Sequence, residues 1–150
     1  MLIEVNKKEH YLYPGLLFAH DEPHAVTTVL GSCVSVCLWD PVMRKGGINH
    51  IMMPLWNGDG IASTKYGNIA IPRLIEKMLQ MGCKKSNLRA KVFGGATIIQ
   101  NTSGLLDIGN SNISIVDSLL ADEEIPIIAQ DCGGSMGRRL LFYTDTGDVF

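Results

Sequence analysis

Cys33 has the sequence context of a nucleophile. It lies in Gly31-Ser32-Cys33, a corner between two apolar runs at 24–30 and 34–40, and a lone His50 follows in a further apolar run. A tight turn can present a thiol to a cleft, and a neighbouring imidazole can convert that thiol into a thiolate. One thiol, one base and a pair of oriented amide donors are sufficient for a cysteine hydrolase or transferase.

The Gly-Ser-Cys corner also predicts where an anion would be stabilised. After Gly31 the backbone can turn sharply and expose the N–H groups of Ser32 and Cys33, so we expect Ser32 on the substrate-binding side of the site. The alternative for Cys33 is a small buried hydrophobic residue, which is what most free cysteines are. Cys37 lies four residues further along the same run, on the same side of the pleat, and is the better core candidate.

His50 is the candidate base, and its alternative is a buried histidine with a purely structural role. The run that contains Cys33 is followed directly by the run that contains His50, with the glycine-rich turn 44–47 between them. Antiparallel pairing across such a turn would bring His50 back toward Cys33. Of the other histidines, His10, His20 and His24 lie in a polar N-terminal region and suit a cleft less well.

A third group must fix the tautomer and orientation of the imidazole. Thr27 and Thr28 are the local candidates, since a hydroxyl or carbonyl can do this, and either can equally be an ordinary β-branched strand residue. Asp40 is the charged alternative, but its position beside Pro41 favours a turn.

Length and composition restrict the protein class. The 150 residues suit one domain spanning 1–150, and 46% hydrophobic with 19% charged residues allow a substantial core. A net charge of -2 gives no basic surface for nucleic acid, and no run has the length and composition of a membrane span or signal peptide. We therefore expect a cytoplasmic protein whose four cysteines are reduced. No Cys-x-x-Cys spacing occurs, so no metal or other cofactor is expected.

Hydrophobic periodicity predicts a layered α+β sandwich. Helices are expected at 68–81, with Pro72 in its first turn or at a kink, and after a capping Asn110. Strands are expected at 24–30, 34–40, 47–53, 88–93, 125–129 and 139–143, with a short last strand after a turn at 144–147.

The motifs of this chain resemble those of the CheD family, the chemoreceptor glutamine deamidases of bacterial and archaeal chemotaxis. The resemblance covers nearly the whole chain. It is carried by Thr27-x-x-Leu30-Gly31-Ser32-Cys33-Val34, Asp40-Pro41, Gly46-Gly47-Ile48-Asn49-His50-Ile51-Met52-Met53-Pro54, Lys65-Tyr66-Gly67, Lys91-Val92-Phe93-Gly94-Gly95-Ala96, Ile108-Gly109-x-x-Asn112, Gly133-Gly134-x-x-Gly137-Arg138-Arg139 and Thr146-Gly147.

The resemblance implies a single-domain α/β/β sandwich and a Cys-His-Thr triad, carried onto Cys33, His50 and Thr27. Thr27 is preferred to Thr28 because it stands six positions before the cysteine, as the family pattern requires. The implied reaction converts glutamines on the cytoplasmic helices of methyl-accepting chemotaxis receptors to glutamates through a Cys33 thioester. Weak methylesterase activity at the same positions is a further implication, and a monomer is expected.

Two other function classes stay open. CheD-like proteins are similar to ones that bind a CheC phosphatase, which acts on phosphorylated CheY, so the chain can instead be mainly a regulatory binding partner. A cysteine protease or acyltransferase is the third reading, and nothing in the sequence favours it. A Cys33→Ala protein that still binds and regulates would separate binding from turnover.

Overall fold

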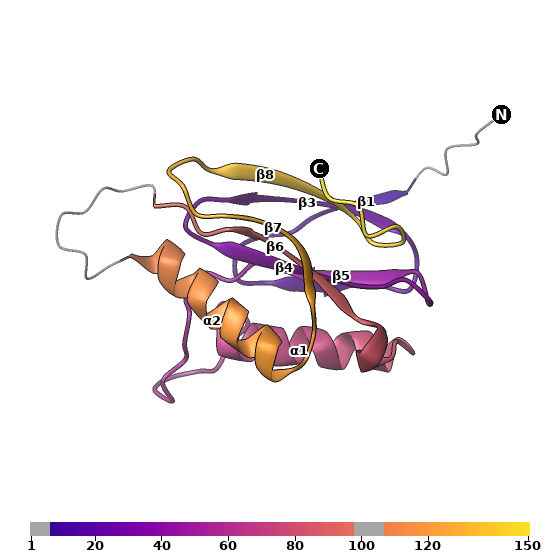
Figure 1. Ribbon diagram of the computed structural model, residues 1–150, viewed down its shortest axis with the longest axis horizontal. Coiled ribbons are helices and arrows are strands. Elements are labelled where there is room, and N and C mark those ends of the chain that lie inside the picture. Colours follow the sequence, from indigo (N-terminus) through magenta and orange to yellow (C-terminus); the bar gives the residue numbers. More distant parts are fainter. Residues whose placement is uncertain (1–6, 98–106) are drawn as a thin grey trace.

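Two β-sheets and a pair of helices are stacked in three layers in the computed structural model, which describes residues 7–97 and 107–150 (Figure 1). A three-stranded sheet of order β1-β3-β8 covers one face of a five-stranded sheet of order β2-β5-β4-β6-β7, and α1 and α2 cover the other face. The elements are β1 Lys8–Tyr11, β2 Leu17–Ala19, β3 His24–Leu30, β4 Val34–Asp40, β5 Lys45–Asn49, α1 Gly67–Gln80, a 3₁₀ turn Lys85–Asn87, β6 Arg89–Gly94, α2 Ile108–Asp122, β7 Ile127–Cys132 and β8 Arg138–Tyr143. The predicted α+β fold, an α/β/β sandwich, is confirmed.

Two apolar cores lie on the two faces of the five-stranded sheet. The core between the sheets contains Leu12, Val26, Cys37, Ile48 and Phe142. The larger core lies between the five-stranded sheet and the helices, and includes apolar residues from β4, β6 and both helices. Because β4 is the central strand and is covered on both faces, every one of its residues except Trp39 is buried.

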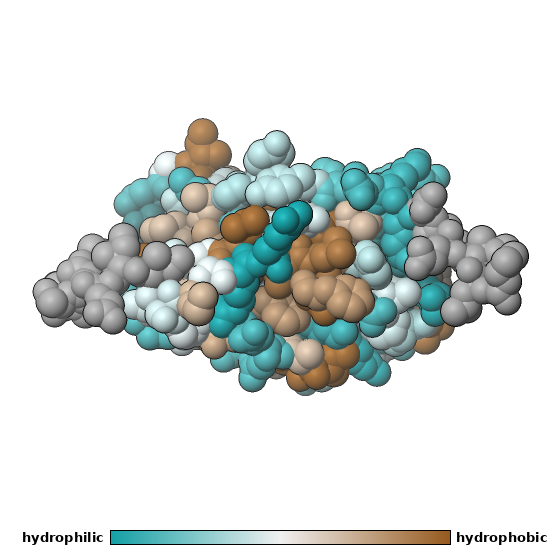
Figure 2. All heavy atoms as spheres, turned by 90° about the horizontal axis from the view of Figure 1, so that it is seen from above, coloured by the Kyte–Doolittle hydropathy of each residue, from teal (hydrophilic) through white to brown (hydrophobic). Residues whose placement is uncertain are grey.

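The strand β3 follows a period of two. Val26, Thr28 and Leu30 are completely buried against the second sheet, whereas Val29 is 51% exposed on the outer face. Figure 2 looks onto this outer side of the molecule, where hydrophobic side chains are interleaved with hydrophilic ones. The side on which a β3 residue lies therefore decides whether it can reach the second sheet.

Both predicted helices are present, with different starts. The apolar stripe of α1 is buried through Ile71, Leu74 and Met78, and Pro72 lies in its second turn. In α2 the cap is Asp107, whose side chain accepts a hydrogen bond from the Asn110 amide. The expected Asn110 cap is therefore wrong, because the helix begins at Ile108, three residues earlier than that cap would place it.

Several strand bounds also differ from prediction. β5 ends at Asn49, so His50 lies just beyond the regular strand. At this point the side-chain oxygen of Asn49 accepts the hydrogen bond of the Val36 amide (2.8 Å), in place of a backbone carbonyl of the β4–β5 ladder. The strand expected at 125–129 begins later, as β7, and the short strands β1 and β2 were not predicted. Among the described residues, neither helix has the length and apolar character needed to cross a bilayer.

Candidate active site

The ladder between β4 and the segment after β5 brings Cys33 and His50 to one face. Val34 and Ile51 exchange two backbone hydrogen bonds, of 3.0 and 2.8 Å, and both side chains belong to the helix-side core. The neighbour of Ile51, His50, points the other way, toward Thr28 of the three-stranded sheet. The same alternation, continued one residue before β4, predicts that Cys33 faces this side as well. This register makes the two residues diagonal neighbours, a relation in which Cα atoms are typically about 7–8 Å apart.

His50 is held from the opposite sheet by Thr28. The Oγ1 of Thr28 lies 2.7 Å from Nδ1 of His50 and donates a hydrogen bond of 2.8 Å to the carbonyl oxygen of Leu12. All three residues are at most 1% exposed. The hydrogen-bonded chain thus connects the two sheets through their common interior.

This chain of hydrogen bonds selects one tautomer of His50. A hydroxyl has a single proton, and the Leu12 carbonyl can only accept, so the proton of Thr28 points to Leu12. Thr28 must then accept a hydrogen bond from Nδ1–H of His50. With its proton on Nδ1, the neutral imidazole has its lone pair on Nε2, which is the form required of a base.

The expectation that Thr27 orients the imidazole is corrected by this geometry. Thr27 precedes Thr28 on β3 and faces the outer side of the three-stranded sheet, where it lines a shallow groove with His10 and Arg139. Successive side chains of a strand point to opposite faces, so Thr27 is separated from His50 by the sheet itself. Thr28, the residue given second place from sequence, is the one that contacts His50.

The backbone around Cys33 is fixed through its carbonyl groups. Those of Gly31 and Cys33 accept hydrogen bonds from the amides of Ala96 (3.0 Å) and Gly95 (2.9 Å). Within residues 7–97 and 107–150, the amides of Ser32 and Cys33 have no hydrogen-bond acceptor. Two unpaired donors beside a thiol are the arrangement that an oxyanion requires.

Gly94 permits this close packing. Its φ is +106°, a backbone conformation that side chains strongly disfavour, and a Cβ there would collide with the carbonyl oxygen of Cys33. The turn after β6 can therefore lie directly against the corner that carries the thiol.

Burial keeps both partners neutral at rest. Desolvation lowers the pKa of His50 from 6.5 to about 4. It also raises the pKa of Cys33, which is half-buried and so remains in contact with solvent. The site therefore combines a neutral thiol with a neutral base, and the proton moves only when a substrate is attacked.

Two neighbouring residues behave as structural groups, in agreement with the sequence analysis. Cys37 is 1% exposed in the core between the sheets, where burial raises its pKa far above the ordinary range. Asp40 is buried and begins a turn, accepting hydrogen bonds from the amides of Val42 (2.9 Å) and Met43 (3.0 Å). Neither residue is directed at the thiol.

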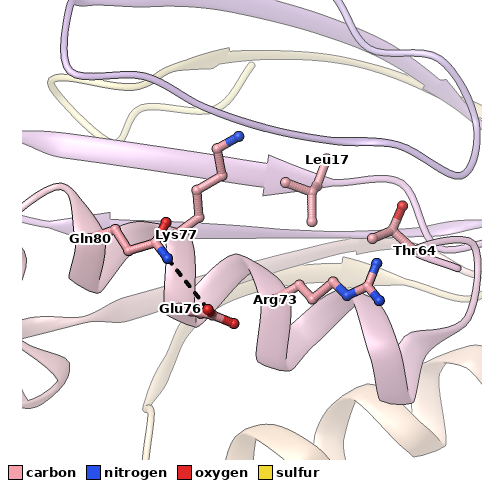
Figure 3. Close-up of a pocket in the computed structure, with 6 residues that line it drawn as sticks. All are labelled: Leu17, Thr64, Arg73, Glu76, Lys77 and Gln80. Carbon is pink, nitrogen blue, oxygen red and sulfur yellow. Dashed lines mark hydrogen bonds between the residues drawn. The ribbon is translucent and has the colours of Figure 1, made fainter. Parts of the chain in front are cut away.

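Two surface grooves of the described residues lie away from Cys33 and His50. One, shown in Figure 3, lies along α1 and β2 and is lined by Leu17, Thr64, Arg73, Glu76, Lys77 and Gln80. A second groove follows the exposed side of α2 near Leu55. Neither of these two grooves includes Cys33 or His50. No cluster of three or more metal-ligating side chains occurs among the described residues.

Two parts of the site could not be assigned from sequence. The Leu12 carbonyl is a backbone group, and no residue type indicates such a role. Asn112 of α2 stands in one of the motifs quoted above, without a role, and it is completely buried beside the Cys33 corner. The available signal in the sequence was an asparagine on a helix face whose other residues are apolar.

Comparison with known proteins identifies the family of this chain. The family model for CheD, described as CheD chemotactic sensory transduction, matches residues 52–150. A protein of Trichlorobacter lovleyi named probable chemoreceptor glutamine deamidase CheD is 46% identical over 142 residues, covering 95% of this chain and 88% of that protein. One of the same name from Sulfurimonas denitrificans is 44% identical over 149 residues, covering 98% of this chain and 94% of that protein. A third, from Anaeromyxobacter dehalogenans, is named probable chemoreceptor glutamine deamidase CheD 1 and is 42% identical, covering 91% and 80%. This chain therefore belongs to the CheD family.

Proposed function

We propose that this protein deamidates glutamine side chains of chemoreceptors, with Cys33 as the nucleophile and His50 as the base. The observation that carries the proposal is the hydrogen-bonded chain from His50 through Thr28 to Leu12. It leaves the lone pair of His50 on Nε2, on the sheet face to which Cys33 also points. The names of the relatives supply the substrate class, a glutamine of a chemoreceptor.

The first half of the reaction forms a thioester. Nε2 of His50 takes the proton of the Cys33 thiol as sulfur attacks the carboxamide carbon of the glutamine. The amides of Ser32 and Cys33 stabilise the oxyanion, and loss of one such donor typically raises the barrier by about 2.7–4 kcal/mol. The protonated His50 then gives its proton to the departing nitrogen, and ammonia leaves.

The second half releases the product. His50, again neutral, takes a proton from water as the water oxygen attacks the thioester carbon. The carbon–sulfur bond breaks, the thiolate recovers the proton from His50, and the receptor side chain leaves as glutamate. A glutamyl methyl ester has the same acyl carbon and loses methanol instead of ammonia, so we include weak methylesterase activity in the proposal.

Thr28 supports the charged form of the base. When His50 is protonated, Nδ1–H donates to a hydroxyl oxygen whose own proton is already engaged by Leu12. The fixed dipole of that hydroxyl therefore points its negative end at the imidazolium. This support is weaker than that of a carboxylate, which agrees with a base that stays neutral until attack.

The test is mass spectrometry of the cytoplasmic fragment of a chemoreceptor after incubation with wild-type protein, Cys33→Ala or Cys37→Ala. We expect glutamine-to-glutamate conversion at discrete helical positions with wild type and Cys37→Ala, and none with Cys33→Ala. Conversion by folded Cys33→Ala would overturn the nucleophile. If no variant converts any of several folded receptors, while wild type and Cys33→Ala both bind a CheC-type phosphatase, the regulatory-partner function is correct instead.

A further inference from the structure

Asn112 contacts both backbone segments that carry the reacting side chains. Its Nδ2 donates to the carbonyl oxygen of Ser32 at 3.1 Å and to that of Met52 at 3.2 Å. Ser32 immediately precedes Cys33, and Met52 follows His50 by two residues. The side chain thus connects the Cys33 corner to the His50 segment from a third element, α2.

The orientation of this amide is fixed by its partners. Both acceptors are carbonyl oxygens, so only the NH₂ end of the side chain can face them. Both of its protons are used, one for each carbonyl. The two backbones are therefore held at a separation set by one planar amide group.

Close packing of α2 places Asn112 at this position. Gly109 lies one helical turn earlier, and a Cβ there would come within 2.5 Å of the Gly95 carbonyl oxygen. The absence of a side chain at Gly109 lets the helix lie against the same turn that binds the Cys33 corner. Asn112 can then reach past this contact to both carbonyls.

The burial of Asn112 leaves one of its polar atoms unsatisfied. Its Oδ1 is buried and has no hydrogen-bond partner among the described residues, although the residue is completely inaccessible to solvent. An apolar residue of similar volume would leave no unpaired acceptor on the helix. The feature that only an amide supplies here is the double donor.

We propose that Asn112 is a positioning residue that holds Cys33 and His50 in reacting register. This inference rests on the proposed function, because it assigns Asn112 a role through that pair. The hydrogen bonds of the Asn112 side chain go to backbone carbonyls and not to the thiol or the imidazole. Its removal should therefore lower kcat, by about tenfold or more, and leave KM within about twofold, since reacting geometry is lost and binding surface is kept.

The test measures coupling between Asn112 and His50 without any receptor. Alkylation of Cys33 by iodoacetamide at pH 7 is followed by peptide mass spectrometry in wild type, His50→Gln, Asn112→Leu and the double variant. We expect His50→Gln to slow alkylation at least tenfold in the wild-type background and less than twofold in the Asn112→Leu background. Asn110→Leu is the matched control, because Asn110 lies on the same helix, is exposed, and its side chain bonds to Asp107 alone among the described residues. It should keep the full dependence on His50.

The outcomes separate the two proposals. A folded Asn112→Leu protein that keeps the tenfold dependence on His50 would overturn the positioning role, whatever its melting temperature. Absence of any His50 effect in the wild-type background would instead overturn the base, and the positioning role with it. If Asn112→Leu does not fold, Asn112→Ser takes its place, because serine retains one donor in a smaller side chain. The effect of His50→Gln on the alkylation rate should then lie between the effects expected in the wild-type and Asn112→Leu backgrounds.

Discussion

Replacing Thr28 by valine removes one oxygen atom that makes two buried hydrogen bonds. Valine has nearly the same shape as threonine, so the packing between the sheets is kept. Nδ1–H of His50 and the carbonyl of Leu12 both lose their partner in a region at most 1% exposed. An unsatisfied buried polar group costs about 1–3 kcal/mol, so with two such groups we expect the free energy of unfolding to fall by about 2–6 kcal/mol.

The same change should slow catalysis. In the transition state His50 carries a proton, and a hydrogen bond that involves a charged group contributes about 1.5–3 kcal/mol. Loss of that hydrogen bond corresponds to a decrease in kcat of about 10- to 100-fold. Thr28→Ser keeps the hydroxyl and should retain most of the activity.

Thr27→Val is the matched control for Thr28→Val, because Thr27 is on the same strand but on its outer face. The assay is the initial rate of glutamine-to-glutamate conversion in a receptor fragment, with thermal unfolding recorded for each variant. We expect a wild-type rate for Thr27→Val. A tenfold loss in Thr27→Val together with a normal rate in Thr28→Val would refute the assignment of Thr28 and restore the residue that the family pattern indicates.

Three further changes test other parts of the structure. Cys37→Ala should lower the free energy of unfolding by about 1–2 kcal/mol, because it removes the sulfur atom from a core position, and should leave the deamidation rate unchanged. A slower rate at an unchanged melting temperature would contradict this. As pH falls from 6.5 to about 4, the unfolded chain gains a proton on His50 that the native state does not. The free energy of unfolding should therefore fall through this window by roughly 2–3 kcal/mol more in wild type than in His50→Gln. Equal pH slopes for the two proteins would be evidence against a buried neutral His50. Gly94→Ala should destabilise the protein by about 1–3 kcal/mol and abolish deamidation, because the new methyl group meets the Cys33 carbonyl. Wild-type activity and stability in this variant would show that the Cys33 corner can move to accommodate the methyl group.

The bounds of β3 and β4 are predictable from sequence because both ends carry strong signals. Gly31 and Pro41 cannot continue regular strands easily, and most residues of the two strands are apolar or β-branched. The end of β5 is less visible, since it depends on the Asn49 side chain replacing a backbone acceptor. The strands β1 and β2 have four and three residues, too few for a periodic pattern to emerge.

The choice between Thr27 and Thr28 could not be made from strand periodicity. Val26 and Val29 are both apolar although they lie on opposite faces of β3, so the alternation does not indicate which face is inside. The family pattern points to Thr27, whereas pairing between the two sheets turns Thr28 toward His50. His50 can be selected from sequence because it is the one titratable residue in its apolar segment. Cys33 is distinguished from Cys37 only by the Gly31-Ser32 corner that precedes it.

The most direct test of this account is the protonation state of His50 in solution. Nitrogen-15 NMR of the histidine side chains at pH 7, with the His50 signals assigned by comparison with His50→Gln, distinguishes the two neutral tautomers and the cation. The account predicts a neutral ring with its proton on Nδ1, and conversion to the other tautomer or to a mixture in Thr28→Val. A proton on Nε2, or a cationic ring at pH 7 in the wild-type protein, would contradict the claim that Thr28 holds His50 ready as the base for Cys33.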